Sequence, residues 1–260
     1  MIMKRFKSRK ILLKYMDFPR KSIEQLITKL IKVGIEPSSN RLVFNALFES
    51  RLIHGGQERD NFDNVLDGHI WPVVDSCIDF CVAEGKPVTS ELVAGAMLHE
   101  ALEDSHHYMH HPDDFGQTYG DRMYKIVKGV TKPSVRDPIF ANETNPRRAR
   151  IVYFFEQLQV SPEESKIIVL ADRLHNIHCI PFYYRFRWIK DLSKAGVRKF
   201  DSVDKPHDKY LRMLRETNEF YLPFSKNFSE YWYKKFDERL REMCARIPPL
   251  FLKEQPPILT

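Results

Sequence analysis

Residues 91–105, ELVAGAMLHEALEDS, begin as a nearly continuous apolar run and end with one histidine and three acids. The apolar run predicts a deeply buried helix. On one helix, residues four apart share a face, so we expect His99 to lie above Glu103. By the same spacing, Glu100 should lie above Asp104. A packed helix has no use for four such side chains at its end, which makes a chemical site as good an explanation as a solvated helix edge.

The rest of the chain carries the same helical period. Its 260 residues are 43% hydrophobic and 29% charged, an ordinary globular mixture. Apolar residues mostly recur at intervals of three and four, and the evenly alternating segments typical of strands are scarce. Ser22–Gln25 is a capping box before an amphipathic helix, Asn40 is suited to start a second helix, and residues 70–83 are predicted to form another. We therefore expect an all-α fold, a single helical bundle.

No internal repeat and no clear boundary divides the chain. We expect a basic N-terminal extension over residues 1–21, one domain over 22–245 and a proline-rich tail over 246–260. Two stretches inside the domain, 106–117 and 131–146, are expected to be loops. The first contains HHYMHH, whose histidines are candidates for a second metal site, although a solvated loop is the favoured interpretation.

Charge and cysteine content limit the partners and the compartment. A net charge of +6 and a pI near 9.0 favour anionic partners, either phosphorylated small molecules or nucleic acid. FYYRFRW, residues 182–188, interleaves aromatic and arginine side chains as single-stranded RNA surfaces do, so RNA is a candidate partner; an aromatic face packed into the domain is the favoured alternative. The four cysteines predict neither a zinc site nor a disulfide framework. Because no apolar run approaches roughly 20 residues and no secretory signal opens the chain, we expect a cytoplasmic protein with no membrane partner.

A second motif, LADRLHN at residues 170–176, places an acid at the end of another buried run. Asp172 follows IIVLA, and Asn176 comes one helical turn later on the same face. A carboxylate in such a position is costly unless it is paired or bound to a metal. An ion pair with the adjacent Arg173 is the alternative explanation.

One further histidine, His69 in DGHIWP, stands just before a hydrophobic stretch. Together with His99, Glu100 and Asp172 it makes a mixed set of imidazoles and carboxylates. Such a set suits Mn²⁺ or Fe²⁺ better than a structural zinc ion, which usually takes more sulfur or nitrogen. Whether the four side chains converge depends on the fold.

Six segments in order resemble the hydrolase domain of the RelA/SpoT homologue family, which has the HD phosphohydrolase fold. They are HGGQER (54–59), DGHIWP (67–72), LHEALED (98–104), YGDRMYKIVKGVTK (119–132), IIVLADRLHNI (167–177) and RMLRETNEFYLPFS (212–225). No synthetase-type domain follows them in this sequence. The resemblance therefore implies a small, stand-alone alarmone hydrolase.

The resemblance implies that the chain removes pyrophosphate from the 3′ position of (p)ppGpp with the help of Mn²⁺. It assigns the metal to His69, His99, Glu100 and Asp172. It assigns the positioning and deprotonation of the attacking water to Glu103 and Asp104, which makes chemical sense beside a metal ion. It assigns contacts with the nucleotide and its phosphates to Arg59, Lys132, Asn176 and Arg212.

Three departures from the family pattern affect the substrate and the metal. Glu100 stands where the family has aspartate, Asp60 where it has a basic residue, and Cys179 where it has threonine. Two of these lie where the family recognises the base. An adenine alarmone such as ppApp, the 2′-phosphate of NADPH, or a pyrophosphorylated RNA end in an antitoxin role are therefore alternative substrates. A non-catalytic nucleotide-binding module is the alternative from a different class.

Overall fold

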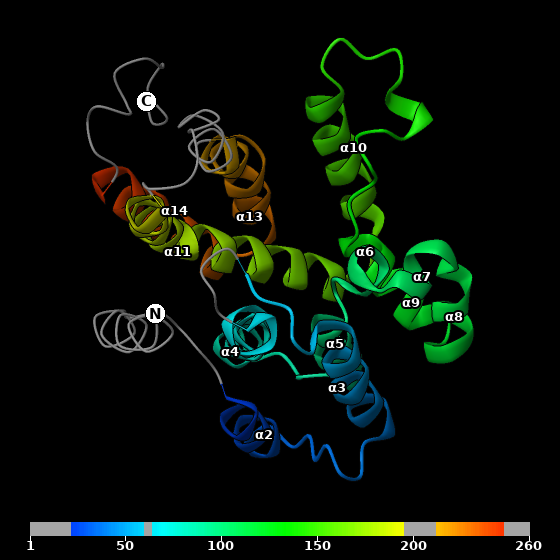
Figure 1. The fold of residues 1–260 in the computed structure, drawn as a ribbon. Coiled ribbons are helices and arrows are strands. Elements are labelled where there is room, and N and C mark those ends of the chain that lie inside the picture. Colours follow the sequence, from blue (N-terminus) through cyan, green and yellow to red (C-terminus); the bar gives the residue numbers. More distant parts are fainter. Residues whose placement is uncertain (1–21, 60–63, 195–211, 247–260) are drawn as a thin grey trace.

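In the part of the chain that the structure describes, helices make up the regular structure (Figure 1). The computed structural model describes residues 22–59, 64–194 and 212–246. Within them the only extended pairing is a single bridge between Glu58 and Asn64. The helices are α2 (Ile23–Lys32), α3 (Arg41–His54), α4 (Trp71–Ala83), α5 (Ser90–Met97), α6 (Ala101–Asp104), α7 (His106–His110), α8 (Pro112–Tyr119), α9 (Asp121–Val130), α10 (Pro146–Val160), α11 (Glu163–Lys194), α13 (Leu222–Phe228) and α14 (Glu230–Arg246), with shorter turns η1 (Leu66–Ile70), η2 (Pro138–Phe140) and η3 (Thr217–Tyr221). The prediction of an all-α fold is confirmed.

Two parts of the predicted organisation lie outside these residues. The basic extension over 1–21 and the proline-rich tail from residue 247 onward are not described. The side chains of FYYRFRW are not described either, so the RNA hypothesis stays a prediction. None of the helices in the described residues combines the length and apolar character needed to cross a bilayer.

Local sequence signals start the first helices where they were expected. Ser22 caps α2, and its side chain and that of Gln25 exchange the two hydrogen bonds of a capping box. The Asn40 side chain accepts from the N–H of Val43 at 3.1 Å and so begins α3. These caps satisfy donors that a helix start leaves without an internal partner.

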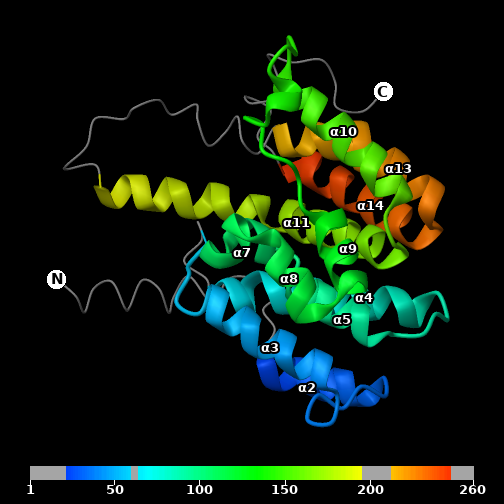
Figure 2. The ribbon, with the colours of Figure 1, turned by 90° about the vertical axis from the view of Figure 1, so that its right-hand side faces the viewer.

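Helix α11 crosses the middle of the molecule over α4 and α5, and α3 packs against α5 (Figures 1 and 2). Gly95 permits the close approach of α5 to its neighbours. A Cβ atom there would lie 2.7 Å from Ile126 Cγ2 of α9 and 3.1 Å from Ile168 Cδ1 of α11. Both distances are too short for a side chain without movement, so this contact sets how near α11 comes to the end of α5.

The predicted continuous helix over residues 91–104 is wrong, because it ends at Met97 and restarts at Ala101. The His99 ring makes the break. In a continuous helix the carbonyl of Ala96 would accept from the N–H of Glu100. Here His99 Nδ1 donates to that carbonyl at 2.8 Å. The chain therefore turns at His99 and Glu100. The expected closeness of Glu100 and Asp104 is kept all the same, because the N–H of Asp104 donates to the Glu100 carbonyl at 2.8 Å and the two carboxylates have oxygen atoms within 4.8 Å of each other.

The predicted loop over residues 106–117 is also wrong, because it contains α7 and most of α8. Ser105 caps α7 by accepting from the N–H of Tyr108, and Pro112 starts α8. The rings of Tyr108 and Phe115 are buried and lie 5.3 Å apart in an edge-to-face pair. Two aromatic anchors among many polar residues stabilise these short helices, and the histidines between them stay exposed.

Candidate active site

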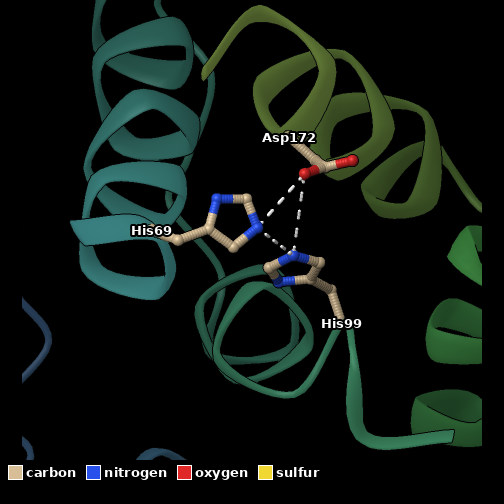
Figure 3. Close-up of side chains that lie close together, drawn as sticks. All are labelled: His69, His99 and Asp172. Atoms are coloured by element: carbon tan, nitrogen blue, oxygen red, sulfur yellow. Dashed lines mark hydrogen bonds and ion pairs between the residues drawn. The ribbon is translucent and has the colours of Figure 1, made fainter. Parts of the chain in front are cut away.

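His69 enters the site from a turn that precedes α4. The π-helical turn η1 leads directly into Trp71 and Pro72. Pro72 has no N–H and cannot donate the hydrogen bond that a regular helix would need at this position. The wider π-helical turn before it accommodates the missing bond. The His69 side chain is fully buried and its ring lies between α4 and α11 (Figure 3).

Side chains from distant parts of the sequence converge on this ring (Figure 3). His69 Nε2 lies 3.3 Å from His99 Nε2 and 3.3 Å from Asp172 Oδ1. His99 Nε2 lies 3.9 Å from Asp172 Oδ1, and Glu100 Oε1 lies 3.5 Å from His69 Nε2. At about 2.1 Å from a cation, neighbouring octahedral ligands lie about 3 Å apart and opposite ligands about 4 Å apart. The separations and the nitrogen and oxygen donors therefore fit one divalent first-row ion.

Hydrogen bonds fix which nitrogen of each ring faces the group. His99 Nδ1 donates to the Ala96 carbonyl, and because a carbonyl only accepts, His99 Nε2 is left with its lone pair toward Asp172. His69 Nδ1 lies 3.0 Å from His175 Nδ1. Burial lowers the pKa of His175 well below its usual value, so that ring is neutral and can accept from His69 Nδ1. Both rings present Nε2 to the group, as metal-binding histidines supported by an outer partner do.

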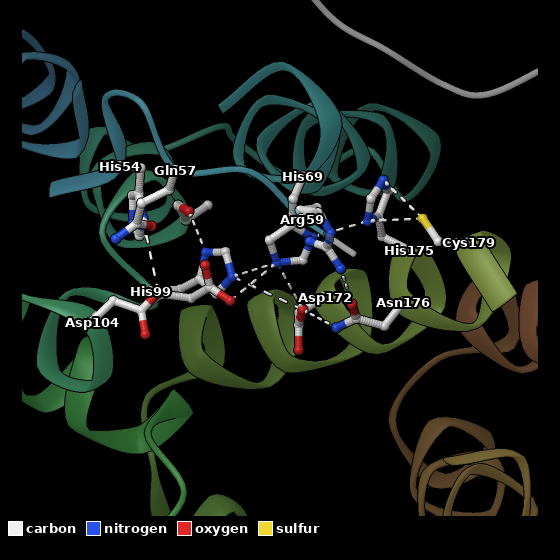
Figure 4. Close-up of polar contacts among 12 residues, drawn as sticks. His54, Gln57, Arg59, His69, His99, Asp104, Asp172, His175, Asn176 and Cys179 are labelled. Atoms are coloured by element: carbon white, nitrogen blue, oxygen red, sulfur yellow. Dashed lines mark hydrogen bonds and ion pairs between the residues drawn. The ribbon is translucent and has the colours of Figure 1, made fainter. Parts of the chain in front are cut away.

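Neighbours on α11 and from the segment after α3 support Asp172 (Figure 4). Asn176 Nδ2 donates to Asp172 Oδ1 at 2.5 Å, which confirms that the two share a face of the helix. Asn176 Oδ1 in turn accepts from Arg59 Nη2 at 2.8 Å. Arg173 turns instead to Glu216, whose carboxylate lies 3.1 Å away, and to the Thr217 hydroxyl. Arg173 therefore does not account for the buried acid.

The two acids of α6 lie beside the side chains of His69, His99, Glu100 and Asp172, which we call the metal-type group. Glu103 Oε1 accepts from the backbone N–H of Lys132 at 3.1 Å. Asp104 Oδ2 lies 3.9 Å from His54 Nδ1. Burial raises the pKa of Glu103, and burial together with the charge of Glu100 raises the pKa of Asp104. Raised values make both carboxylates better proton acceptors than free acids.

The carboxyl groups of Glu100 and Asp172 have the opposite character. Burial would raise the pKa of each group, but the neighbouring rings of His69 and His99 outweigh it and hold both pKa values well below their usual range. The four carboxyl groups thus divide into two that stay anionic and two that can take up a proton. Hydrolytic sites that use a metal ion and a general base need this division.

Lys132, one of the predicted phosphate contacts, keeps its positive charge close to Asp172 and Glu103. Burial lowers the pKa of Lys132, but Tyr221, Asp172 and Glu103 outweigh it, so its ammonium stays charged near both acids. Its Nζ lies 4.9 Å from the centre of the Phe154 ring.

Arg212 is the most remote of the predicted substrate residues. Its side chain is 45% exposed, and its Nε lies 3.9 Å from Glu216 Oε1. Since Glu216 also accepts from Arg173, Arg212 is linked to the site through the residue that follows Asp172. The structure does not bring Arg212 into contact with the metal-type group among the described interactions.

Three side chains near the group had no role assigned from the sequence. His54 and Gln57 lie in HGGQER, and His175 lies in LADRLHN, so all three belonged to segments that had attracted notice for other residues. His54 Nδ1 lies 2.8 Å from Gln57 Oε1 (Figure 4). The signal that could have found His175 is its place on α11 between Asp172 and Asn176, which both serve the site.

Comparisons with known proteins bear on the fold. No protein-family model and no curated protein sequence matches the chain. Among solved structures, one that matches is described as a metazoan ortholog of SpoT that hydrolyzes ppGpp and plays a role in starvation responses. The TM-score is 0.51 at 16% sequence identity, over 78% of this chain and 96% of that chain. The two share a fold. The architecture of the present chain is thus an all-α bundle of the HD-domain type.

Proposed function

We propose that the chain is a metal-dependent hydrolase that removes the 3′-pyrophosphate from (p)ppGpp or a related alarmone. The observation that carries the proposal is the convergence of His69, His99 and Asp172, with Glu100 beside them, at the end of α5. The structural neighbour with the same fold hydrolyzes ppGpp. The net charge of +6 suits a polyphosphate substrate.

The four side chains around His69 would hold the metal, and Mn²⁺ is the ion proposed. Two imidazoles and two carboxylates suit Mn²⁺, whereas a structural zinc ion usually takes more sulfur or nitrogen ligands. When bound, such an ion lowers the pKa of a water molecule and withdraws charge from a phosphoryl group.

The residues around the metal would divide the remaining work. Glu103 and Asp104 would orient the attacking water and take up its proton, which their raised pKa values favour. Asn176 holds the Asp172 carboxylate, and it also holds the guanidinium of Arg59 in place. Arg59, Lys132 and Arg212 would supply positive charge to the substrate phosphates. The purpose of these contacts is to place the scissile bond opposite the water.

The test is incubation of the purified protein with ppGpp and Mn²⁺, with GDP and pyrophosphate followed by anion-exchange chromatography. A Glu100→Asp variant runs beside the wild type, and a sample treated with a chelator is the control. We expect pyrophosphate release by the wild type and none after chelation. If the wild type does not hydrolyse ppGpp and Glu100→Asp does, Glu100 is a residue that weakens a functional metal site.

A substrate panel separates the remaining hypotheses. It contains ppGpp, ppApp, NADPH and RNA with a pyrophosphorylated end. Turnover of ppApp in the absence of ppGpp hydrolysis would change the base and keep an alarmone hydrolase. Turnover of NADPH or RNA alone would overturn the assignment of an alarmone and keep the hydrolase. Tight binding of ppGpp without turnover of any of the four would favour the non-catalytic nucleotide-binding module.

A further inference from the structure

A second group of metal-ligating side chains adjoins the first. His54, Glu100 and Asp104 each offer one ligand atom, and these atoms all lie within 4.8 Å of one another. Glu100 also has Oε1 3.5 Å from His69 Nε2, so its carboxylate lies between the two groups. The groups are therefore neighbours that share one acid.

The His54 ring occupies an unusual position for a core residue. It is the last residue of α3 and is fully buried, and its Nε2 has no hydrogen-bond partner among the described residues. Its polar contacts are made by Nδ1, which lies 2.8 Å from Gln57 Oε1 and 3.9 Å from Asp104 Oδ2 (Figure 4). His54 Nδ1 therefore faces both an amide oxygen and a carboxylate oxygen, and a ring nitrogen with such oxygens is a donor set that a divalent cation takes.

These distances match those between ligands of one cation. Ligands about 2.1 Å from an octahedral ion lie about 3 Å apart when they are neighbours and about 4 Å apart when they are opposite. The 2.8 Å between His54 Nδ1 and Gln57 Oε1 fits neighbouring ligands. The 3.9 Å between His54 Nδ1 and Asp104 Oδ2 is close to the separation of opposite ligands. Gln57 adds an amide oxygen, so the set contains one imidazole and several oxygen donors. Oxygen-rich sets of this kind suit Mn²⁺ or Mg²⁺.

We propose that His54, Gln57, Glu100 and Asp104 bind a second divalent cation next to the first, with the Glu100 carboxylate shared between the two ions. The inference rests on the metal site of the proposed function. Glutamate is one methylene longer than aspartate and so has the reach to lie between both groups. The second ion also offsets the repulsion among the three acids at the α5–α6 corner, Glu100, Glu103 and Asp104.

A second ion changes the chemistry that the site offers. Paired ions about 3.5–4 Å apart stabilise both the attacking and the leaving oxygen of an in-line displacement at phosphorus. Asp104 then serves as a ligand, and Glu103 is the acid that takes the proton from water. The division agrees with the contacts, since Asp104 faces His54 whereas Glu103 accepts from the backbone of Lys132.

The experiment counts metal ions in the whole chain. Wild-type protein is equilibrated with Mn²⁺ and desalted, and metal per chain is measured by elemental analysis together with the electron paramagnetic resonance spectrum. We expect about two ions per chain and the exchange-coupled signal of a carboxylate-bridged pair. His54→Gln and Asp104→Asn should each retain one ion and show the signal of isolated Mn²⁺. His110→Ala, which removes an exposed histidine on α7, should keep both ions.

Several outcomes would overturn the second site. They are one ion in the wild type, or two coupled ions in both His54→Gln and Asp104→Asn. His54 is buried, and its replacement can prevent folding; Asp104 is 44% exposed, so Asp104→Asn keeps the test decisive. Metal counting also separates this inference from the proposed function. Two ions without ppGpp hydrolysis would support the second site alone, whereas hydrolysis with one ion would support the function alone.

Discussion

The α5–α6 corner and helix α11 both supply side chains to the metal-type group, but they do so in different ways. On α11, Asp172 and Asn176 lie on consecutive turns of an uninterrupted helix and hydrogen-bond to each other. At the corner, His99 and Glu100 lie where the helix stops, and the His99 ring itself takes up the carbonyl that ends it. Helical spacing locates side chains reliably only where no side chain competes for the backbone hydrogen bonds.

The difference also determines what supports each ligand. Asp172 is supported by side chains, Asn176 and through it Arg59, which a substitution can remove. His99 is supported by a backbone carbonyl, which no substitution removes. Side-chain substitutions should therefore disturb the α11 half of the site more easily, and changes in packing should disturb the corner.

The largest effect is expected from Asp172→Asn on α11. The change keeps the size of the side chain and its hydrogen bond from Asn176 but removes the charge. Loss of an outer partner of a metal ligand typically costs 10–100-fold in affinity, so loss of this ligand should weaken Mn²⁺ binding by more than about 100-fold. Isothermal titration calorimetry measures it, with the exposed Asp113→Asn on α8 as control. Equal affinity in both variants would exclude Asp172 as a ligand.

On the corner, Glu103→Gln separates proton transfer from metal binding. If Glu103 accepts the proton of the attacking water, hydrolysis of ppGpp should fall by about 100- to 10,000-fold. Because Glu103 is not expected to touch the ion, Mn²⁺ affinity should be unchanged. Glu156→Gln, an exposed acid on α10, is the matched control. A parallel loss of metal would show instead that Glu103 is a ligand.

His175→Phe tests the outer support that α11 gives to His69. Phenylalanine fills a similar volume but lacks the nitrogen that lies 3.0 Å from His69 Nδ1. Mn²⁺ affinity should fall by about 10- to 100-fold. Cys179→Ala removes the weaker contact of the sulfur atom, which lies 3.8 Å from each of the two ring nitrogens of His175, and should leave the affinity unchanged. If His175→Phe binds as tightly as the wild type, the orientation of His69 does not depend on this contact.

The smallest effect is expected from Gly95→Ala, which pushes the corner and α11 apart. The added methyl group would meet Ile126 and Ile168. Overpacking of this kind should lower the free energy of unfolding by about 1–3 kcal/mol, measured by urea denaturation. At Gly116 on α8 the nearest atoms would lie 3.6 Å away, so Gly116→Ala should be neutral or stabilising by up to about 1 kcal/mol. Equal stability of the two variants would mean that α5 does not pack as tightly as described.

Much of the helical framework could be predicted from single segments. The caps at Ser22 and Asn40, and the shared face of Asp172 and Asn176, follow from hydrogen bonds between residues three or four apart, which are local in the sequence. Helices α7 and α8 could not be predicted in this way. Their polar composition indicates a loop, and only the burial of Tyr108 and Phe115 against the rest of the fold makes helices favourable.

The sequence by itself therefore determined the helical class, the order of the motifs and the residue types available for a metal-type site. The tertiary structure decided that His69, His99 and Asp172 meet, and that the helix breaks at His99. It also placed His175 against His69, and His54 near Glu100 and Asp104. The reason is physical. Helical periodicity acts over one or two turns, whereas the position of the break depends on a competition for the Ala96 carbonyl. The packing of α4, α5 and α11 then brings the break at His99 beside His69 and Asp172, which are distant in the sequence but close in space.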